Sequence, residues 1–172
     1  MIKYGDERAA ITRIKEMSLP GAVLKIWAGL NQVECPLLLL EKPEDFQGVA
    51  LSYGVERDDV QRLLPIFGSD TNLWCLDESS QNYVLWNYED DTIKEVGRTY
   101  QQMIASLLRG YVESAFSDDE LSCIGEFLEF RHHDLIIKYA SGGYRYPEDI
   151  QIADVDERYD IARIRMLADI TD

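Results

Sequence analysis

The residue types most often used for metal binding and nucleophilic catalysis are few and scattered in this chain. The only two histidines, His132 and His133, are adjacent. Neighbouring residues on a helix point about 100° apart, so these imidazoles do not suit a single metal ion. Cys35, Cys75 and Cys123 form neither a Cys-x-x-Cys pattern nor a secreted disulfide framework. No nucleophile motif surrounds Cys123, and we expect it to be a small buried core residue.

Acidic residues are abundant, but their spacing fits no catalytic or calcium-binding motif. The run from Asp154 to Asp160 has alternate carboxylates, yet Arg158 and Tyr159 stand where an EF-hand loop needs a ligand and a glycine. Carboxylate pairs for glycoside hydrolysis could be chosen almost at will from 32 acidic residues, so that count alone indicates nothing. The sequence therefore predicts no enzyme activity, no cofactor and no metal ion.

Turns between aromatic strands offer a different kind of site, a surface for a partner. Trp74 and Trp86 lie on these strands with two tyrosines, residue types that concentrate binding energy, although alternation should bury at least half of them. Acidic residues accompany them in the turns and occur again on a later helix. The simpler interpretation of these acidic residues is that they lie in solvated turns and on a solvated helix face. The residues predicted to bind a partner are Glu78, Tyr83, Tyr88, Glu89, Asp90, Asp91, Asp118, Asp119 and Glu120.

The overall charge limits the kind of partner. The 172 residues include 17 basic and 32 acidic side chains, and this net charge of -15 repels phosphate backbones and anionic lipid headgroups. We therefore expect no nucleic acid and no membrane partner, whereas the same field attracts a basic protein. Acidity for solubility alone is the competing explanation. The longest uninterrupted apolar run, Pro36 to Leu40, is too short to span a bilayer, and we expect a cytoplasmic protein.

The stretch that positions the candidate residues, 64–108, has the pattern of a β-meander followed by a long helix. The first strand should lie at a sheet edge, because Pro65 cannot donate to a ladder. Two strands of aromatic and branched residues follow at 73–76 and 83–88, joined by a polar turn. Apolar residues then recur at helical spacing from Ile93, and Thr92 with Glu95 has the spacing of a capping box, so we predict a helix from there.

Helices and possible short strands precede this stretch. Apolar spacing predicts an N-terminal helix pair, from Asp6 to Met17 and from Pro20 to Leu30, with Asn31 as the left-handed stop of the second helix. Pro36 to Leu40 is either a buried strand or the core-facing end of a loop, and periodicity alone does not distinguish the two. Val49 to Tyr53 is a short possible strand.

The C-terminal third is predicted to be a helical extension, residues 112–172. One helical stripe lies within 121–130, and a last helix over about 157–170 should turn Ile161, Ile164, Leu167 and Ala168 inward. We therefore predict one α+β domain over residues 1–172, an antiparallel meander of about four to six strands packed against helices.

Three short motifs occur in the chain in a fixed order. They are Ser18-Leu19-Pro20 before a tryptophan-containing helix, Leu64-Pro-Ile-Phe-Gly-Ser-Asp before the aromatic strands, and Trp86-Asn-Tyr-Glu-Asp-Asp before the long helix. Together these motifs resemble the SUKH superfamily over about Leu19 to Leu108. This chain has Asn31-Gln32-Val33 where many members have Asn-Gly-Gly, and the part after Val112 has no counterpart in the pattern.

The resemblance implies a fold used mainly for binding proteins, with no catalytic residues to transfer. The superfamily includes bacterial immunity proteins that neutralise polymorphic toxins, and fungal regulators of cell-wall glucan synthesis. We therefore expect a non-enzymatic immunity protein that binds a basic toxin domain through an acidic surface. The alternative is a regulatory or scaffold protein with an endogenous cytoplasmic partner. A carboxylate-dependent hydrolase, which needs a deep cleft with two carboxylates of raised pKa, is the third hypothesis. The oligomeric state stays open.

Overall fold

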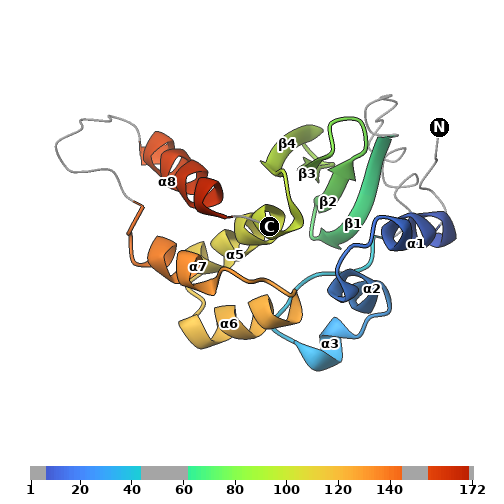
Figure 1. Cartoon of the computed structure of the whole chain (residues 1–172), viewed down its shortest axis with the longest axis horizontal. Coiled ribbons are helices and arrows are strands. Elements are labelled where there is room, and N and C mark those ends of the chain that lie inside the picture. The colour runs from blue at the N-terminus through green and yellow to red at the C-terminus, as the bar shows by residue number, and fades with distance from the viewer. Residues whose placement is uncertain (1–6, 44–61, 145–154, 171–172) are drawn as a thin grey trace.

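A four-stranded antiparallel meander organises the computed structural model, which describes residues 7–43, 62–144 and 155–170 (Figure 1). Each strand pairs with the next in the chain, in the order β1-β2-β3-β4. The strands are β1 (Leu63–Ser69), β2 (Asn72–Asp77), β3 (Asn82–Asn87) and β4 (Thr92–Gly97). The predicted α+β class is confirmed, and the strand with Pro65 lies at an edge of the sheet as expected.

The alternation predicted for the aromatic strands is present. On one face of the sheet, Val84 and Trp86 belong to a small buried cluster with Leu73 and Cys75. The opposite face contributes Trp74, Leu76 and Tyr83 to the main hydrophobic core. Because successive side chains on a strand point to opposite faces, both faces of β2 and β3 carry large apolar residues, and both are buried.

The fourth strand corrects the prediction of a helix from Ile93. Residues Thr92–Gly97 pair with β3, with Ile93 opposite Trp86 and Glu95 opposite Val84. Helix α5 (Tyr100–Glu113) begins only afterwards, where Thr99 accepts a hydrogen bond from the Gln102 N–H at 3.2 Å. The Thr-x-x-Glu spacing at 92–95 therefore does not form a capping box, because the strand ladder satisfies this backbone instead.

The predicted N-terminal helix pair is present, but its end differs. Helix α1 (Glu7–Glu16) is followed by α2 (Gly21–Trp27), and the left-handed residue after α2 is Gly29, with φ of 72°. Asn31 begins the short helix α3 (Asn31–Glu34) instead of ending α2. Its side chain is buried, and its Nδ2 donates to the carbonyl oxygen of Leu40 at 2.6 Å. A buried amide thus ties α3 to the segment that follows it.

The segment predicted as a possible strand at Pro36–Leu40 is a turn followed by extended chain. Only the next residue, Glu41, pairs with the sheet, exchanging two backbone hydrogen bonds of 2.8 Å with Gly68. The other possible strand, Val49–Tyr53, lies outside the described residues. So does Asp154, where the alternate carboxylates of the C-terminal run begin.

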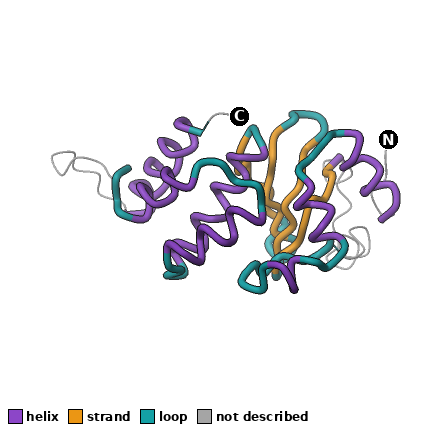
Figure 2. Tube along the Cα trace, turned by 60° about the horizontal axis from the view of Figure 1, so that its bottom comes forward, coloured by secondary structure: helices purple, strands orange, loops and turns teal. Residues whose placement is uncertain are grey.

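The C-terminal helices α6 (Asp118–Phe127), α7 (His133–Ala140) and α8 (Val155–Asp169) share one hydrophobic core with α5 and the sheet. Figure 2 shows the strands between these helices and the N-terminal ones. The predicted inward face of α8 is wrong for Ile164, which is 57% exposed, and for Ala168. The helix instead buries Ala162 and Met166, where it packs on α5 and α7, and Ile170 directly after the helix is buried as well.

The turn between β2 and β3 is fixed by the carboxylate of Asp77, which supports a pH prediction. Burial alone raises the pKa of this carboxyl, but hydrogen bonds from Ser79 and Ser80 and the Arg62 guanidinium together lower it. The Ser79 N–H and hydroxyl donate to Oδ1 at 2.9 and 2.8 Å, and Arg62 Nε lies 3.0 Å away.

Replacing Asp77 with asparagine should lower the free energy of unfolding at pH 7 by about 1–3 kcal/mol, because charge-assisted hydrogen bonds are lost. Since the folded-state pKa is depressed, this stabilisation is present above the unfolded pKa and is lost as pH falls through the folded pKa. Urea unfolding from pH 7 down to pH 2 should therefore show the gap between wild type and Asp77→Asn closing below about pH 4. A gap of constant size would contradict this role.

Candidate protein-binding surface

The acidic residues predicted around the meander turns separate into two groups at opposite ends of the sheet. Glu78 lies in the β2–β3 turn, where its Oε1 is 2.7 Å from Nε of Arg13 on α1. This ion pair neutralises the carboxylate and holds it in place. Glu78 is therefore a poor candidate for a partner contact, although the prediction placed it with the other turn acids.

The β3–β4 turn carries the second group, Tyr88 to Asp91. The Asn87 side-chain oxygen accepts the N–H groups of Glu89 and Asp90 at 3.0 Å each, so this turn is built around one amide. The Tyr88 hydroxyl donates to the Asp70 carbonyl oxygen, and the Trp86 indole N–H donates to Asp91 at 3.4 Å. Glu89 and Asp90 remain exposed at this end of the sheet and are available to a partner.

Tyr83 is not available to a partner, which corrects its place in the predicted set. Its side chain is 6% exposed and packs edge-on against Tyr100 of α5, with ring centroids 6.5 Å apart. The cause is its position on the face of β3 that meets α5, because alternation places residues 83 and 85 on that face. The interface prediction is wrong for this residue and remains a prediction for Tyr88, which is half-buried.

The start of α6 brings together the acids predicted there. Ser117 and Glu120 form a capping box, in which the Ser117 N–H donates to Glu120 at 2.8 Å and the Ser117 hydroxyl accepts the Glu120 N–H. The backbone and side-chain hydrogen bonds from Ser117 lower the pKa of Glu120, whose carboxylate is thus committed to the cap. Asp118 and Asp119 are exposed on the same turn.

An exposed apolar patch on and after α3, which we call the α3 patch, was not predicted as a site. Its most exposed members are Val33, at 82%, and Leu39, at 69%. In the run of four leucines, Leu38 and Leu40 are buried, so the alternate residues face outward. That run was a signal available in the sequence. The α3 patch consists of Leu30, Val33, Leu37 and Leu39.

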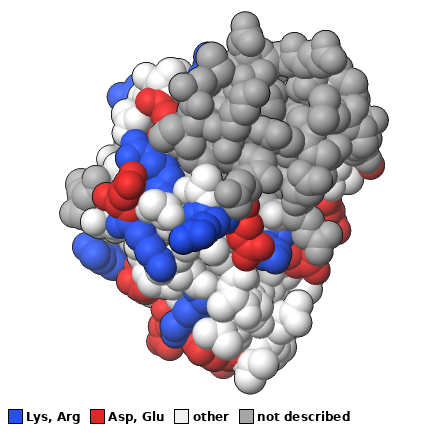
Figure 3. Space-filling model, turned by 90° about the vertical axis from the view of Figure 1, so that its right-hand side faces the viewer, with Lys and Arg blue, Asp and Glu red and all other residues white. Residues whose placement is uncertain are grey.

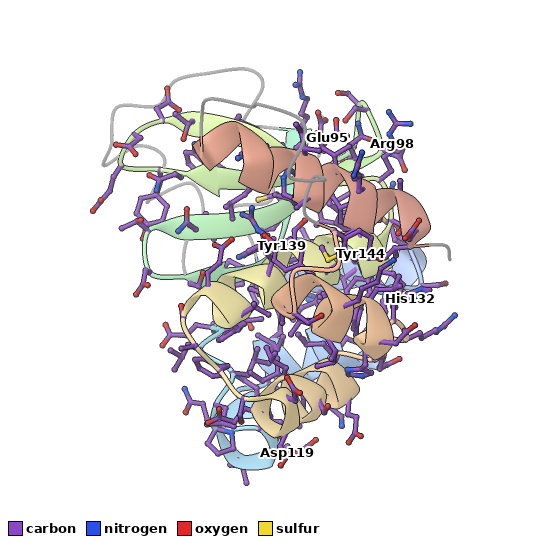
Figure 4. All side chains as sticks on the ribbon, turned by 90° about the vertical axis from the view of Figure 1, so that its left-hand side faces the viewer. Glu95, Arg98, Asp119, His132, Tyr139 and Tyr144 are labelled. Atoms are coloured by element: carbon purple, nitrogen blue, oxygen red, sulfur yellow. The ribbon has the colours of Figure 1, made fainter. Side chains whose placement is uncertain are left out.

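Helices α3 and α6 lie on the same side of the molecule, the lower side in Figure 1. The sulfur atoms of Cys35, which ends α3, and Cys123 on α6 are 3.9 Å apart. The Leu39 N–H donates to the Tyr111 hydroxyl at 3.2 Å, and the Tyr111 ring packs on Phe116 just before α6. These contacts bring α6, which carries the exposed Asp118 and Asp119, close to the segment that carries Leu39; Asp119 is labelled in Figure 4.

The same contact corrects the prediction for Cys123. This cysteine is exposed, although its sulfur touches that of Cys35, which is buried in the core. Burial, followed by the hydrogen bond and the charge of Cys123, raises the pKa of the Cys35 thiol to about 11. Cys35 is thus a protonated thiol at neutral pH and a weak nucleophile.

The face on the α1 side has a different electrostatic character. Figure 3 shows basic and acidic side chains intermixed there. Lys25 pairs with Glu34 at 2.7 Å, and Lys42 pairs with Glu7 at 3.1 Å. Much of the charge on this face is therefore balanced within the chain, which makes it a weaker attractor for a basic partner than the acids of α6 and of the β3–β4 turn.

The two histidines pack against an aromatic side chain of the core. His132 precedes α7 and His133 begins it, and the rings of both pack edge-on against Phe130, at 5.9 and 5.5 Å. Within the described residues, no three His, Cys, Asp or Glu side chains gather in a way that could hold a metal ion. No helix in the part of the chain that the structure describes combines the length and apolar character needed to cross a membrane.

Comparison of the chain with protein-family models, with curated proteins and with solved structures found no match.

Proposed function

We propose that this chain is a cytoplasmic, non-enzymatic protein-binding module whose main contact surface is the α3 patch together with the exposed acids of α6. Its partner is a protein with a basic surface around an apolar centre. The observation that carries the proposal is the exposure of Leu30, Val33, Leu37 and Leu39, together with the exposed Asp118 and Asp119 of α6, the helix that touches the end of α3 through Cys123 and Cys35.

The composition of this surface favours a partner-binding site over a surface that is simply exposed to solvent. Scattered exposed apolar residues are ordinary, but a contiguous group bordered by charge is typical of interaction sites. Partner burial of Val33 and Leu39 would supply the hydrophobic contribution, and the exposed acids would orient a basic partner and speed its association. A net charge of -15 extends that attraction beyond the contact itself.

For the class of partner, the resemblance of residues 19–108 to the SUKH superfamily favours a toxin, which makes the protein an immunity protein. The four-stranded meander followed by a helix agrees with that resemblance at the level of architecture. The alternative partner is an endogenous protein of the same cell, with this chain as a regulatory or scaffold module. Both alternatives use the same surface and differ in whether the partner is toxic.

The experiment is co-expression with the product of the gene immediately upstream, comparing Val33→Arg with Ile164→Arg. Both substitutions place a cation on an exposed apolar position, but only Val33 belongs to the α3 patch. Wild type and Ile164→Arg should rescue growth and bind the partner equally. Val33→Arg should bind it at least about 30-fold more weakly and fail to protect, because like charges meet at the interface. Isothermal titration with the purified partner measures the affinity.

Two further variants locate the contact. Asp119→Lys on α6 should weaken binding, whereas Asp90→Lys in the β3–β4 turn should change it less than threefold, as expected for a charge outside the contact. Full protection by Val33→Arg would contradict the α3 patch as the contact surface. A harmless upstream product that binds through the patch would favour the regulatory alternative, and toxicity that this protein does not relieve would exclude that gene product as its toxin.

A further inference from the structure

A cavity of about 510 Å³ lies between the sheet and α5, with α8 along its side. Leu85, Val96 and Leu107 give it an apolar wall, and the ring of Trp74 adds to that wall. Leu39, at the edge of the α3 patch, reaches its rim, but the other three members of that patch do not line it. The cavity is therefore a second site, distinct from the proposed protein contact.

Three residues that line the cavity each carry a buried hydrogen-bond donor that has no acceptor. They are Nε1 of Trp74, Nε of Arg109 and Nε of Arg163, and they are the only buried side-chain polar atoms in the described residues without a partner. Most buried polar groups in folded proteins find a partner. These three come from β2, α5 and α8, yet they line the same cavity. Trp74 is 6% exposed, so water in the open solvent reaches little of it.

Three basic side chains line the cavity against one acid, Asp70, in an otherwise acidic protein. Lys94 of β4 also lines the cavity, and no ion pair holds it among the residues that the structure describes. Arg109 Nε is 3.8 Å from Glu113, and Arg163 Nε is 3.4 Å from Asp160, distances that keep the charges paired without satisfying either Nε hydrogen bond. An acceptor from outside the chain would complete them.

We propose that this cavity binds a small organic anion, a carboxylate carried on an apolar body. The carboxylate would accept hydrogen bonds from Trp74, Arg109 and Arg163, and the body would pack on the apolar wall. A planar guanidinium suits a carboxylate because two parallel N–H groups meet two oxygens. The volume is within the range of small-molecule sites, whose linings combine apolar side chains with a few placed polar groups.

Binding would also connect α8 to the sheet. Arg163 is the cavity's contribution from α8, whereas Trp74 and Lys94 belong to strands. Figure 4 shows α8 lying across the molecule near the sheet. A ligand held by both sides should slow the opening of this helix, because opening would break its charge-assisted hydrogen bonds. Amide hydrogen exchange of α8 is therefore a readout independent of affinity.

The test is isothermal titration of the full chain with phenylacetate and with phenylacetamide, its neutral analogue. Phenylacetate should bind saturably and at least about tenfold more tightly than the amide, since the charge-assisted hydrogen bonds require the anion. Arg109→Gln and Arg163→Gln should each weaken phenylacetate binding by about tenfold or more. Arg165→Gln, the same change at an exposed arginine of α8, should leave the affinity unchanged within twofold.

Several outcomes would overturn the proposal. These are the absence of saturable phenylacetate binding to the wild type, equal binding of the amide, or unchanged affinity in both arginine variants. Circular dichroism melts identify any variant that fails to fold. In that case Lys94→Gln, at an exposed position, is decisive, and an unchanged affinity there would contradict the site. Val33→Arg should bind phenylacetate like the wild type, which separates this site from the proposed protein contact.

Discussion

Replacing Gly97 with alanine should lower the free energy of unfolding by about 2–4 kcal/mol, because the added methyl group has no room. Gly97 ends β4 where the chain turns into α5. A Cβ atom at this position would lie 2.7 Å from Cβ of Gln102 and 2.8 Å from the backbone nitrogen of Met103. The obstacle is mainly helix backbone, which cannot rotate away, so β4 or α5 must shift.

Gly110→Ala is the matched control, since it adds the same methyl group within α5. No atom lies within 4 Å of a Cβ built at Gly110, and alanine in a helix is favoured over glycine by about 0.5–1 kcal/mol. Urea unfolding followed by circular dichroism should therefore show the two variants shifting in opposite directions. Equal stabilities for Gly97→Ala and the wild type would mean that β4 and α5 are not packed as closely as described.

Asn31→Asp should be the second strongly destabilising change, by about 3 kcal/mol at pH 7, because it removes a buried donor while keeping the shape of the side chain. The Asn31 amide donates to the carbonyl oxygens of Leu40, at 2.6 Å, and of Leu38, at 3.4 Å. A carboxylate at this position would face both oxygens without a proton. The segment that carries Leu37 and Leu39 would lose its attachment to α3.

The pH dependence of this variant has a defined sign. Burial beside carbonyl oxygens should raise the folded-state pKa of the new carboxyl above its unfolded value. A raised folded pKa means that the destabilisation is smallest below the unfolded pKa, about 4, and grows as pH rises through the folded pKa. Gln32→Glu is the control, since the neighbouring side chain is exposed and an added charge there should cost less than about 0.5 kcal/mol. Equal losses in the two variants would contradict the buried role of Asn31.

The sheet was predictable because its information is local. The strands at 73–76 and 83–88 were predicted from alternating large apolar residues and from polar turns. The structure extends the first by one residue at each end and shifts the second by one residue towards the N-terminus. Pro65 likewise indicated an edge strand, which β1 is. These strand and turn patterns depend only on residues a few positions apart, so they can be recognised without knowledge of the rest of the fold.

The errors arose where distant contacts decide the local structure. Residues 92–97 have apolar spacing compatible with a helix, but β3 offers them a ladder, and pairing overrides the capping-box signal. Asparagine is a residue type that often ends helices, but the side chain of Asn31 is instead buried and donates to the carbonyl oxygen of Leu40, nine residues away. Neither the β4 strand nor the buried Asn31 can be derived from residue spacing, because the atoms that hydrogen-bond to these residues belong to other segments of the chain.

The two proposed sites show the same contrast. The acids of α6 were visible as a cluster in the sequence, whereas the run of leucines at 37–40 was interpreted as a buried strand or a loop end and not as a surface. The cavity required Trp74, Lys94, Arg109 and Arg163 to meet from four elements of the fold. One signal was available, since Arg109 is the single basic residue of α5 and directly follows the buried Leu107 and Leu108.

The pairing of every strand with its successor has a consequence for how the chain reaches its native form. Only short turns must close to assemble the ladder, so the entropy lost at each step is small and the contacts are local in sequence. During synthesis all four strands of the sheet leave the ribosome before α6, α7 and α8, because they come earlier in the chain. The nascent sheet can therefore serve as the template on which the later helices condense.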